Sequence, residues 1–311
     1  MRHKLSYANW LNWPKDGDYG FCLSSKKKKA DIDVEPGQEF DNIRQAWMGI
    51  TDLKSKTALV TGASSGLGVD FATELAGRGA DLLLVARRED RLRQLAAGLE
   101  EGYGVEVRVI AMDLSVPGAP DELFEQATAD GARVDVLVNN AGFGVYGRFL
   151  DIPWEREAAM LQLDIVALVQ LTKLFARPMA ARGEGAILQV ASIGGYQPSP
   201  GYATYAAAKA FVLNFGEAIN HELKDTGVSC TVVSPGVTAT EFLEVAGQEQ
   251  GWFHRMTMMD SPTVARLGIE AMLAGKPSTV TGWMNKVSTF SQRLMPRALA
   301  TAVSAMVIKT D

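Results

Sequence analysis

From residue 57 onward the sequence alternates between short apolar runs and longer stretches with helical periodicity. Such alternation requires crossover connections, which are right-handed and make the strands of one sheet parallel. The pattern therefore predicts an α/β fold with a single doubly wound parallel sheet of Rossmann type and helices on both faces. The expected strands are residues 57–61, 82–86, 107–111, 134–138, 186–190 and 229–233, and the expected helices are residues 66–78, 88–100, 120–129, 155–182 and 203–225.

The segments on either side of this patterned region differ from it. Residues 1–47 hold scattered Gly, Pro and Trp and a lysine run, Lys26–Lys29, without a period of 2 or 3.6. We expect them to be a dispensable extension, with Met48 the better start of a domain that covers residues 48–282. The lysine run could touch anionic surfaces, but solvation explains it more simply. Residues 283–311 are amphipathic and are expected to cover the domain or to contact a partner, with a membrane-surface role a less favoured alternative.

Composition excludes several classes of protein. The net charge of −5 leaves no basic excess for a nucleic-acid partner. The two cysteines, Cys22 and Cys230, build no disulfide framework and indicate a reducing, cytoplasmic compartment. The three histidines lie far apart and have no metal-ligand spacing, so no metal site is expected. No apolar run of about 20 residues predicts a transmembrane segment.

A glycine-rich turn follows the first expected strand and leads into a helix. Glycines there allow a tight turn and let a pyrophosphate approach the free N–H groups of the helix N-terminus. The spacing Gly-x-x-x-Gly-x-Gly departs from the Gly-x-Gly-x-x-Gly of long-chain dehydrogenases, but its place in a βαβ unit favours nucleotide binding. The expected contacts are Gly62, Ser64, Ser65, Gly66, Leu67 and Gly68.

The end of the second expected strand discriminates between nicotinamide cofactors. It carries Arg87 and Arg88 and no acidic residue that could bind a ribose 2′-hydroxyl. Two guanidinium groups there are suited to a 2′-phosphate, so NADP(H) is the expected cofactor. A solvated residue at the start of a helix is the alternative, and it is more plausible for Arg88 than for Arg87.

Two further strand ends are candidate cofactor contacts. Asp113 and Leu114 end the third strand and could meet an adenine edge. The small residues after the fourth strand leave room for a ribose or a nicotinamide. These are Asn140, Ala141 and Gly142. Asn139, just before them, is equally well explained as a side chain that ties adjacent strands together.

Tyr205 and Lys209 stand four residues apart in an alanine-rich helical stretch. That spacing places phenol and ammonium on one helix face, where the cation favours the phenolate of a group whose pKa is ordinarily about 10. Such a tyrosine could act as a general acid or base. The same spacing recurs by chance on solvated helices, so its meaning depends on a hydride carrier and an oxyanion partner elsewhere in the chain.

Together these motifs resemble the short-chain dehydrogenase/reductase family, and in particular its NADP-preferring branch with a core of about 250 residues. The turn Thr61–Gly68, the segment Asn139–Gly142, Ser192, the Tyr205/Lys209 pair and Pro235-Gly236 occur in the family's order over about residues 54–282. The resemblance implies a homodimer or homotetramer, assembled through the helices at 155–182 and 203–225.

The resemblance also implies roles for individual residues. Ser192 would hydrogen-bond the reacting oxygen of the substrate and stabilise its developing charge. Tyr205 would transfer the proton, while Lys209 would lower the pKa of that phenol and hold the nicotinamide ribose. The backbone after Pro235 and Gly236, with Thr238 and Thr240, would face the nicotinamide carboxamide.

One position departs from the family pattern. Asp164 stands where the family usually has an asparagine that helps to hold a water linked to the lysine. An ionised carboxylate lacks the amide donor and could weaken the pull of Lys209 on Tyr205. The alternative, which we favour, is that the water needs mainly a backbone carbonyl, so that Asp164 is tolerated.

Residues 241–260 form the expected substrate flap. Its Met and aromatic side chains, with Phe143, Tyr146 and Tyr202, predict an apolar pocket, although the flap could instead pack on its own helix. The expected function is an NADP(H)-dependent oxidoreductase that interconverts a hydrophobic ketone or aldehyde and its alcohol. A non-catalytic NADP(H)-sensing or scaffold protein, and a dehydratase or epimerase, are the alternatives on the same fold.

Overall fold

The computed structural model describes residues 50–248 and 257–308. The chain divides into two units, and every described residue belongs to the second unit, Phe40–Asp311. The expected extension, residues 1–47, and the proposed start at Met48 therefore lie outside the described residues.

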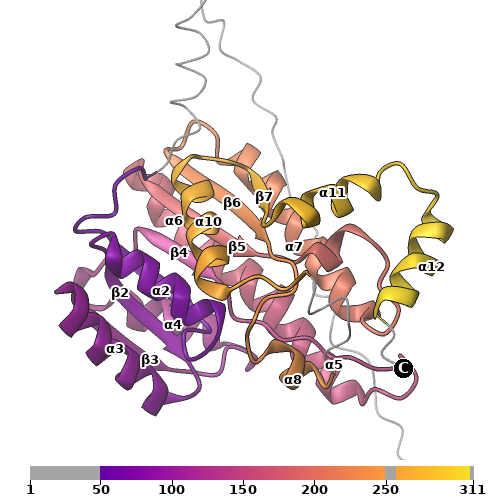
Figure 1. Ribbon diagram of the computed structural model, residues 1–311. Helices are drawn as coiled ribbons and strands as arrows, with labels where there is room; N and C mark the ends of the chain where they lie inside the picture. Colours follow the sequence, from indigo (N-terminus) through magenta and orange to yellow (C-terminus); the bar gives the residue numbers. More distant parts are fainter. Residues whose placement is uncertain (1–49, 249–256, 309–311) are drawn as a thin grey trace, which may run out of the picture. The chain divides into compact units, whose positions relative to one another are not determined.

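A seven-stranded parallel sheet, in the order β3-β2-β1-β4-β5-β6-β7, forms the centre of the second unit (Figure 1). The order reverses direction between β1 and β4, which is the switch point at which doubly wound sheets bind ligands. The predicted fold class is thus confirmed. The strands are β1 (Thr57–Thr61), β2 (Asp81–Ala86), β3 (Val107–Ala111), β4 (Val136–Asn139), β5 (Gly185–Val190), β6 (Val228–Ser234) and β7 (Ser278–Val280).

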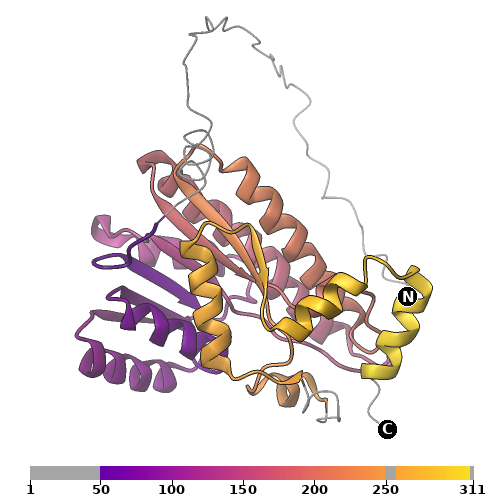
Figure 2. The ribbon, with the colours of Figure 1, turned by 45° about the horizontal axis from the view of Figure 1, so that its top comes forward.

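Helices cover both faces of this sheet (Figures 1 and 2). One face is covered by α2 (Leu67–Gly77), α3 (Glu89–Tyr103) and α10 (Ser261–Leu273), and α2 packs directly on α10. The other face is covered by α4 (Ala119–Ala127), α6 (Leu168–Arg182) and α7 (Ala203–Glu222). The later part of the described chain also contains α8 (Phe242–Ala246), α11 (Trp283–Ser291) and α12 (Arg297–Ile308).

Alternate residues of the central strands feed opposite hydrophobic cores. Leu82 and Leu84 of β2 pack under α2 and α3, while Leu83 and Val85 pack on the other face. All four side chains are at most 1% exposed. Because both faces of a parallel sheet are covered, its strands are continuous apolar runs, which is why the sequence located them well. The strand that the sequence did not predict, β7, has three half-buried residues at the sheet edge and lacks this signature.

A helical stretch from Trp154 to Arg182 combines α5 (Trp154–Leu161), a π-helical segment (Gln162–Ala167) and α6. Although no candidate membrane span was expected, its 29 residues are long and apolar enough to cross a membrane by length and composition. One face of the stretch, with Phe175 and Met179 among its apolar side chains, is buried against the sheet, whereas Trp154 and Val166 are exposed. The stretch is therefore packed as a core helix of this unit.

Candidate active site

One cavity of about 640 Å³ runs along the ends of the central strands. Its volume lies in the range of small-molecule sites. Every catalytic and cofactor-binding residue predicted from the sequence lines this cavity except Gly68. These residues are Gly62, Ser64, Ser65, Gly66, Leu67, Arg87, Arg88, Asp113, Leu114, Asn140, Ala141, Gly142, Ser192, Tyr205, Lys209, Pro235, Gly236, Thr238 and Thr240.

The glycine turn is packed too tightly for side chains. A Cβ atom at Gly68 would lie 2.1 Å from the backbone oxygen of Gly62, so Gly68 allows the first turn of α2 to close against the end of β1. Gly66 precedes the helix with a φ of +52°, in the region that favours glycine. The free N–H groups of the helix therefore face an open cavity, in the arrangement that binds a pyrophosphate.

Thr61 ties the glycine turn to the end of β4. Its hydroxyl donates to the oxygen of Val138 and accepts the backbone N–H groups of Asn140 and Ala141, each at 3.0 Å. The Asn140 side chain donates back to the Thr61 oxygen at 2.9 Å. This network fixes the position of the glycine turn relative to the end of β4, and these two segments form two walls of the cavity.

Asn139 has the structural role that the sequence left open. Its side-chain amide donates to Thr172 and to Gln189, each at 3.1 Å, and so links β4 to β5 and α6. The side chain is buried and does not line the cavity.

The two arginines after β2 differ in solvent exposure. The sequence favours Arg88 as the solvated one, but in the structure Arg87 is the more exposed. Arg88 donates to the hydroxyl and the backbone oxygen of Ser64, both at 3.2 Å, and so lies on the glycine turn. Arg87 has a side chain 74% exposed and a distant ion pair with Asp113 at 3.8 Å. Arg88 occupies the N-cap position of α3, and its side chain is held on the glycine turn, whereas that of Arg87 is largely exposed.

A third arginine was missed by the sequence analysis. Arg91 and Arg88 both pair with Glu241, at 2.8 and 3.3 Å, at the start of the expected flap. These two guanidinium groups hold the pKa of the exposed Glu241 carboxyl below its usual value, with Arg91 the larger influence. Arg91 stands one helical turn after Arg88 in the sequence, and this spacing could have identified it.

The residues expected to perform chemistry converge at the ends of β5 and β6. Tyr205 and Lys209 lie on α7, and the Lys209 ammonium is 5.6 Å from the centre of the Tyr205 ring. The ammonium also donates to the oxygen of Val190 at 3.2 Å. Ser192, just beyond β5, accepts the Gly194 N–H at 3.1 Å, and it lowers the pKa of the Tyr205 phenol.

Asp164 contacts Lys209 directly. The Asp164 side chain is fully buried in the π-helical segment, and its Oδ2 lies 2.9 Å from the Lys209 Nζ. Its Oδ1 accepts the Phe143 N–H at 3.1 Å. A Cβ atom at Gly142 would come within 2.9 Å of that same Oδ1, so only glycine leaves room for the carboxylate. Burial raises the pKa of Asp164, and the charge of Lys209 opposes that rise.

The pKa of Tyr205 shifts in the direction opposite to the expectation. Burial raises it above its ordinary value, the Asp164 carboxylate raises it further, and the hydrogen bond to Ser192 lowers it. The expected lowering by Lys209 does not dominate, because the ammonium is paired with a carboxylate that repels the phenolate. In this structure the phenol is therefore a group that holds its proton.

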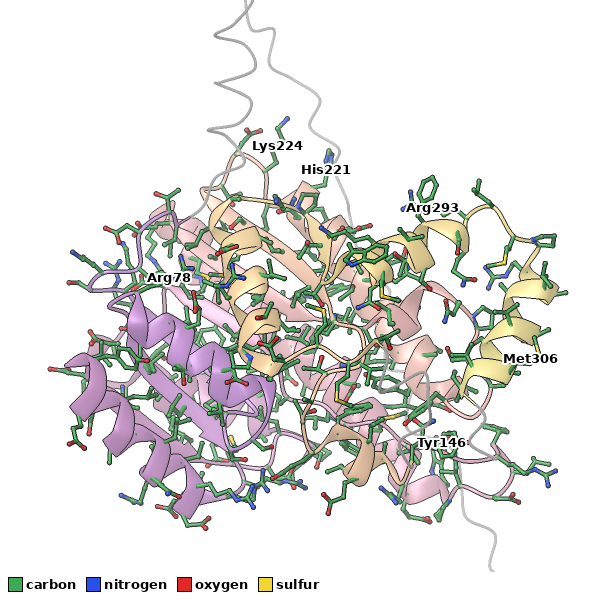
Figure 3. All side chains as sticks on the ribbon, viewed as in Figure 1. Arg78, Tyr146, His221, Lys224, Arg293 and Met306 are labelled. Carbon is green, nitrogen blue, oxygen red and sulfur yellow. The ribbon has the colours of Figure 1, made fainter. Side chains whose placement is uncertain are left out.

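Aromatic rings surround the Tyr205 phenol. The Tyr202 and Phe242 ring centres lie 5.7 and 5.4 Å from that of Tyr205. As expected, Tyr202 and Phe143 line the cavity. Tyr146 is not among the lining residues; it packs against Tyr202 at 5.2 Å, at the edge of the unit seen in Figure 3.

The residues that form the apolar wall of the cavity are not all those expected of the flap. Trp252, Phe253 and Met256 lie outside the described residues, and the described Met258 and Met259 do not line the cavity. Met259 instead pairs with the backbone of residues 237–239. The flap residues that reach the cavity are Glu241, Phe242, Leu243, Val245 and Gln248.

The C-terminal helices supply the rest of this wall. They lie on the right of Figures 1 and 2, in yellow. Gln248 connects them to the site, since it accepts the Tyr202 hydroxyl at 2.8 Å and donates to the Ile308 oxygen at 3.0 Å. Met306 points away on the outer side of α12 (Figure 3) and is 68% exposed. The lining residues here are Ser288, Ser291, Gln292, Met295, Val303, Ser304, Val307 and Ile308.

A glycine turn at a switch point, with Ser192, Tyr205 and Lys209 at the next strand ends, defines a nucleotide-dependent oxidoreductase site on a doubly wound sheet. Comparison with known protein families agrees, because residues 56–251 match the family described as short chain dehydrogenase. The chain belongs to the short-chain dehydrogenase/reductase family and is an oxidoreductase of the NAD(P)H-using type that acts on CH–OH groups.

Known relatives cover most of the chain. The 7beta-hydroxysteroid dehydrogenase of Collinsella aerofaciens is 34% identical over 206 residues, which is 66% of this chain and 78% of that protein. A structure from a study of 7beta-hydroxysteroid dehydrogenase stereoselectivity superposes with a TM-score of 0.74 at 28% identity and covers 83% of this chain and 99% of the other. A short-chain dehydrogenase from Sphingobium yanoikuyae in complex with NADPH has a TM-score of 0.69 at 32% identity, with 77% and 95% covered.

Proposed function

We propose that this protein is an NADP(H)-dependent carbonyl reductase or alcohol dehydrogenase that acts on a bulky, hydrophobic ketone, aldehyde or secondary alcohol. The observation that carries the proposal is that Ser192, Tyr205 and Lys209 line the same cavity as the glycine turn and Arg88. This arrangement supports proton transfer and cofactor binding along one continuous site.

The cofactor end fits a nicotinamide dinucleotide with a 2′-phosphate. At Gly62 and Gly68 the turn has no space for a Cβ atom, and this tight backbone is what the turn of a pyrophosphate site requires. Arg88, held on Ser64, is suited to charge-assisted bonds with the 2′-phosphate. The NADPH bound by the Sphingobium relative supports this choice. When bound, the cofactor supplies or accepts the hydride.

The protein's own residues handle the proton and the developing charge. Ser192 donates a hydrogen bond to the reacting oxygen, and Tyr205 gives its proton to that oxygen during reduction. Since burial and Asp164 favour the protonated phenol, the site is better prepared for reduction than for oxidation near neutral pH. Lys209, oriented by Asp164 and Val190, holds positive charge beside the phenol as the proton leaves.

The walls around Tyr205 favour a bulky apolar substrate. Tyr202, Phe242 and Leu243 form one side, and Val303 and Val307 of α12 form another. The likeness to 7beta-hydroxysteroid dehydrogenases supports a rigid polycyclic ketone or alcohol as the substrate class. The reaction is tested by a screen of such ketones at the NADPH absorbance, with Tyr205→Phe as the inactive reference.

The alternatives give different results in the same screen. A non-catalytic NADP(H)-sensing protein would bind NADPH, seen as quenched tryptophan fluorescence, without consuming it on any ketone. A dehydratase or epimerase would convert substrate without net consumption of NADPH. Steady oxidation of NADPH that depends on both the ketone and Tyr205 would exclude both.

We further propose that the protein works in the cytoplasm as a homodimer or homotetramer. Exposed apolar side chains lie on the helices expected to associate, with Val166 46% and Phe211 41% exposed. Phe211 stacks on Phe215 to extend this apolar surface on α7. Light scattering of the purified protein tests the assembly, and a monomer at micromolar concentration would contradict it.

A further inference from the structure

The cavity extends past the reacting centre to a wall formed by α12. Ser304, Val307 and Ile308 follow one face of this helix at spacings of three and four residues, and all three line the cavity. Two of them are apolar. Ser304 is the exception, a hydroxyl within an otherwise apolar helix face.

The Ser304 hydroxyl lacks a partner where one is expected. The residue is only 4% exposed, and its Oγ has no hydrogen-bond partner among the residues that the structure describes. The Oε1 of Gln292, which lines the same cavity after α11, likewise has none within residues 50–248 and 257–308. Buried polar groups are normally satisfied, so two such atoms on one cavity wall indicate a ligand that bonds them.

The contacts of Gln248 place Ser304 relative to the catalytic end. Gln248 joins the Ile308 oxygen to the Tyr202 hydroxyl, and Tyr202 lies one turn before Tyr205 on α7. Ser304 lies one further turn back along α12, about 6 Å from Ile308. A substrate whose carbonyl meets Tyr205 would therefore reach Ser304 with a part of the molecule remote from that carbonyl.

The chemistry of the two atoms selects the ligand group. Ser304 can donate or accept a hydrogen bond, whereas Gln292 Oε1 only accepts and so requires a donor. The cationic residues that line the cavity in the described part of the chain are Arg87, Arg88 and Lys209, which belong to the cofactor and catalytic ends. A carboxylate or phosphate would find no counter-charge among the described residues of α11 and α12 that line the cavity. A neutral hydroxyl satisfies both side chains.

We propose that Ser304 and Gln292 form a polar subsite that binds a neutral hydroxyl group, carried by a bulky apolar substrate remote from its reacting carbonyl. The inference rests on the proposed function and specifies its substrate class. The preferred substrates are rigid hydroxy-ketones, and the corresponding products are diols.

The test compares two rigid polycyclic ketones that differ only in a hydroxyl or a hydrogen at the end far from the carbonyl. For the wild-type protein we expect kcat/KM to be about tenfold higher for the hydroxy-ketone, the effect of one neutral hydrogen bond. Ser304→Ala should reduce this ratio to near one by slowing the hydroxy-ketone alone. Gln292→Met should lower the ratio in the same direction.

The matched control is Thr301→Val on the same helix. Thr301 does not line the cavity, and its hydroxyl already donates to the Arg297 oxygen at 2.9 Å. This variant should keep the tenfold preference. Equal rates of the wild-type protein on the two ketones, or an equal loss on both in Ser304→Ala, would overturn the subsite.

Calorimetry distinguishes failure of the proposed function from failure of the polar subsite. If the wild-type protein binds NADPH but reduces neither ketone, the proposed function is wrong, and both ketones are then titrated into the NADPH complex. Tighter binding of the hydroxy-ketone, lost in Ser304→Ala and kept in Thr301→Val, would still support the subsite. Equal or absent binding of the two ketones would overturn it.

Discussion

Asp164 and Lys209 form a buried ion pair, with 2.9 Å between the carboxylate Oδ2 and the ammonium Nζ. From the sequence alone, Asp164 is expected to be a tolerated replacement for a residue that helps to hold a water. The direct contact gives it a stronger role, because the carboxylate raises the pKa of Tyr205 while it orients the lysine. Asp164 acts through other residues and is a positioning residue.

Asp164→Asn should shift the pH dependence of turnover. Removing the negative charge lowers the pKa of Tyr205, since the carboxylate is the second-largest cause of its rise after burial. Reduction needs the protonated phenol and is lost as pH rises through that pKa, so its alkaline limb should move to lower pH. Oxidation needs the phenolate and should begin at correspondingly lower pH. Profiles of kcat against pH in both directions measure this, and unchanged profiles would contradict it.

Asp164→Ala should be more damaging to stability than Asp164→Asn. Both variants leave the buried Lys209 ammonium without its carboxylate, and breaking one side of a buried pair costs about 3–5 kcal/mol. Alanine also leaves a cavity and removes the acceptor of the Phe143 N–H. Asparagine keeps the size of the side chain and an oxygen that can accept the Phe143 N–H. Urea unfolding of the two variants checks the order, which would be wrong if they unfold at the same midpoint.

Tyr205→Phe should abolish turnover without abolishing cofactor binding. The phenol is the proton donor, so kcat should fall by about 10³-fold, the scale of general acid catalysis. The glycine turn and Arg88 are untouched, so NADPH should still quench tryptophan fluorescence. Stopped-flow turnover and a fluorescence titration measure the two effects, and a variant with more than a tenth of wild-type kcat would exclude Tyr205 as the acid.

Glu241→Gln should tighten NADPH binding more than NADH binding. The carboxylate pairs with Arg88 and Arg91, and a 2′-phosphate must compete for the same guanidinium groups. The pairs are exposed, so the gain should be small, about two- to fivefold in Kd. Glu244→Gln, an exposed neighbour on α8, is the control and should change neither Kd. An equal change for NADH and NADPH in Glu241→Gln would refute the competition.

Gly142→Ala should disturb both stability and activity. The added methyl group would meet the Asp164 carboxylate at 2.9 Å and displace it from Lys209 and from the Phe143 N–H. Overpacking of this kind costs about 1–3 kcal/mol. Gly98→Ala on α3 has open space around the new methyl group and should be neutral or slightly stabilising. Thermal unfolding and kcat of the two variants provide the comparison.

The sequence by itself determined the parallel sheet, the glycine turn and the pairing of Tyr205 with Lys209. These features depend on local chemistry: apolar runs for strands buried on both faces, glycine where the backbone must close, and a helical spacing of four. The six predicted strands agree with the structure to within two residues at their ends. The short edge strand β7 was not predicted, because its three half-buried residues carry no such pattern.

Tertiary structure decided the features that depend on side chains from distant segments. The distance between Asp164 and Lys209, and therefore the upward shift of the Tyr205 pKa, follows from how the π-helical segment packs on α7. The same holds for Arg88 on Ser64 and for Ser304 in the cavity wall. A pattern of residue types predicts which groups are available. Only their separation and burial fix the direction and size of the pKa shifts that they cause in one another, because electrostatic energy depends on distance and on exclusion of water.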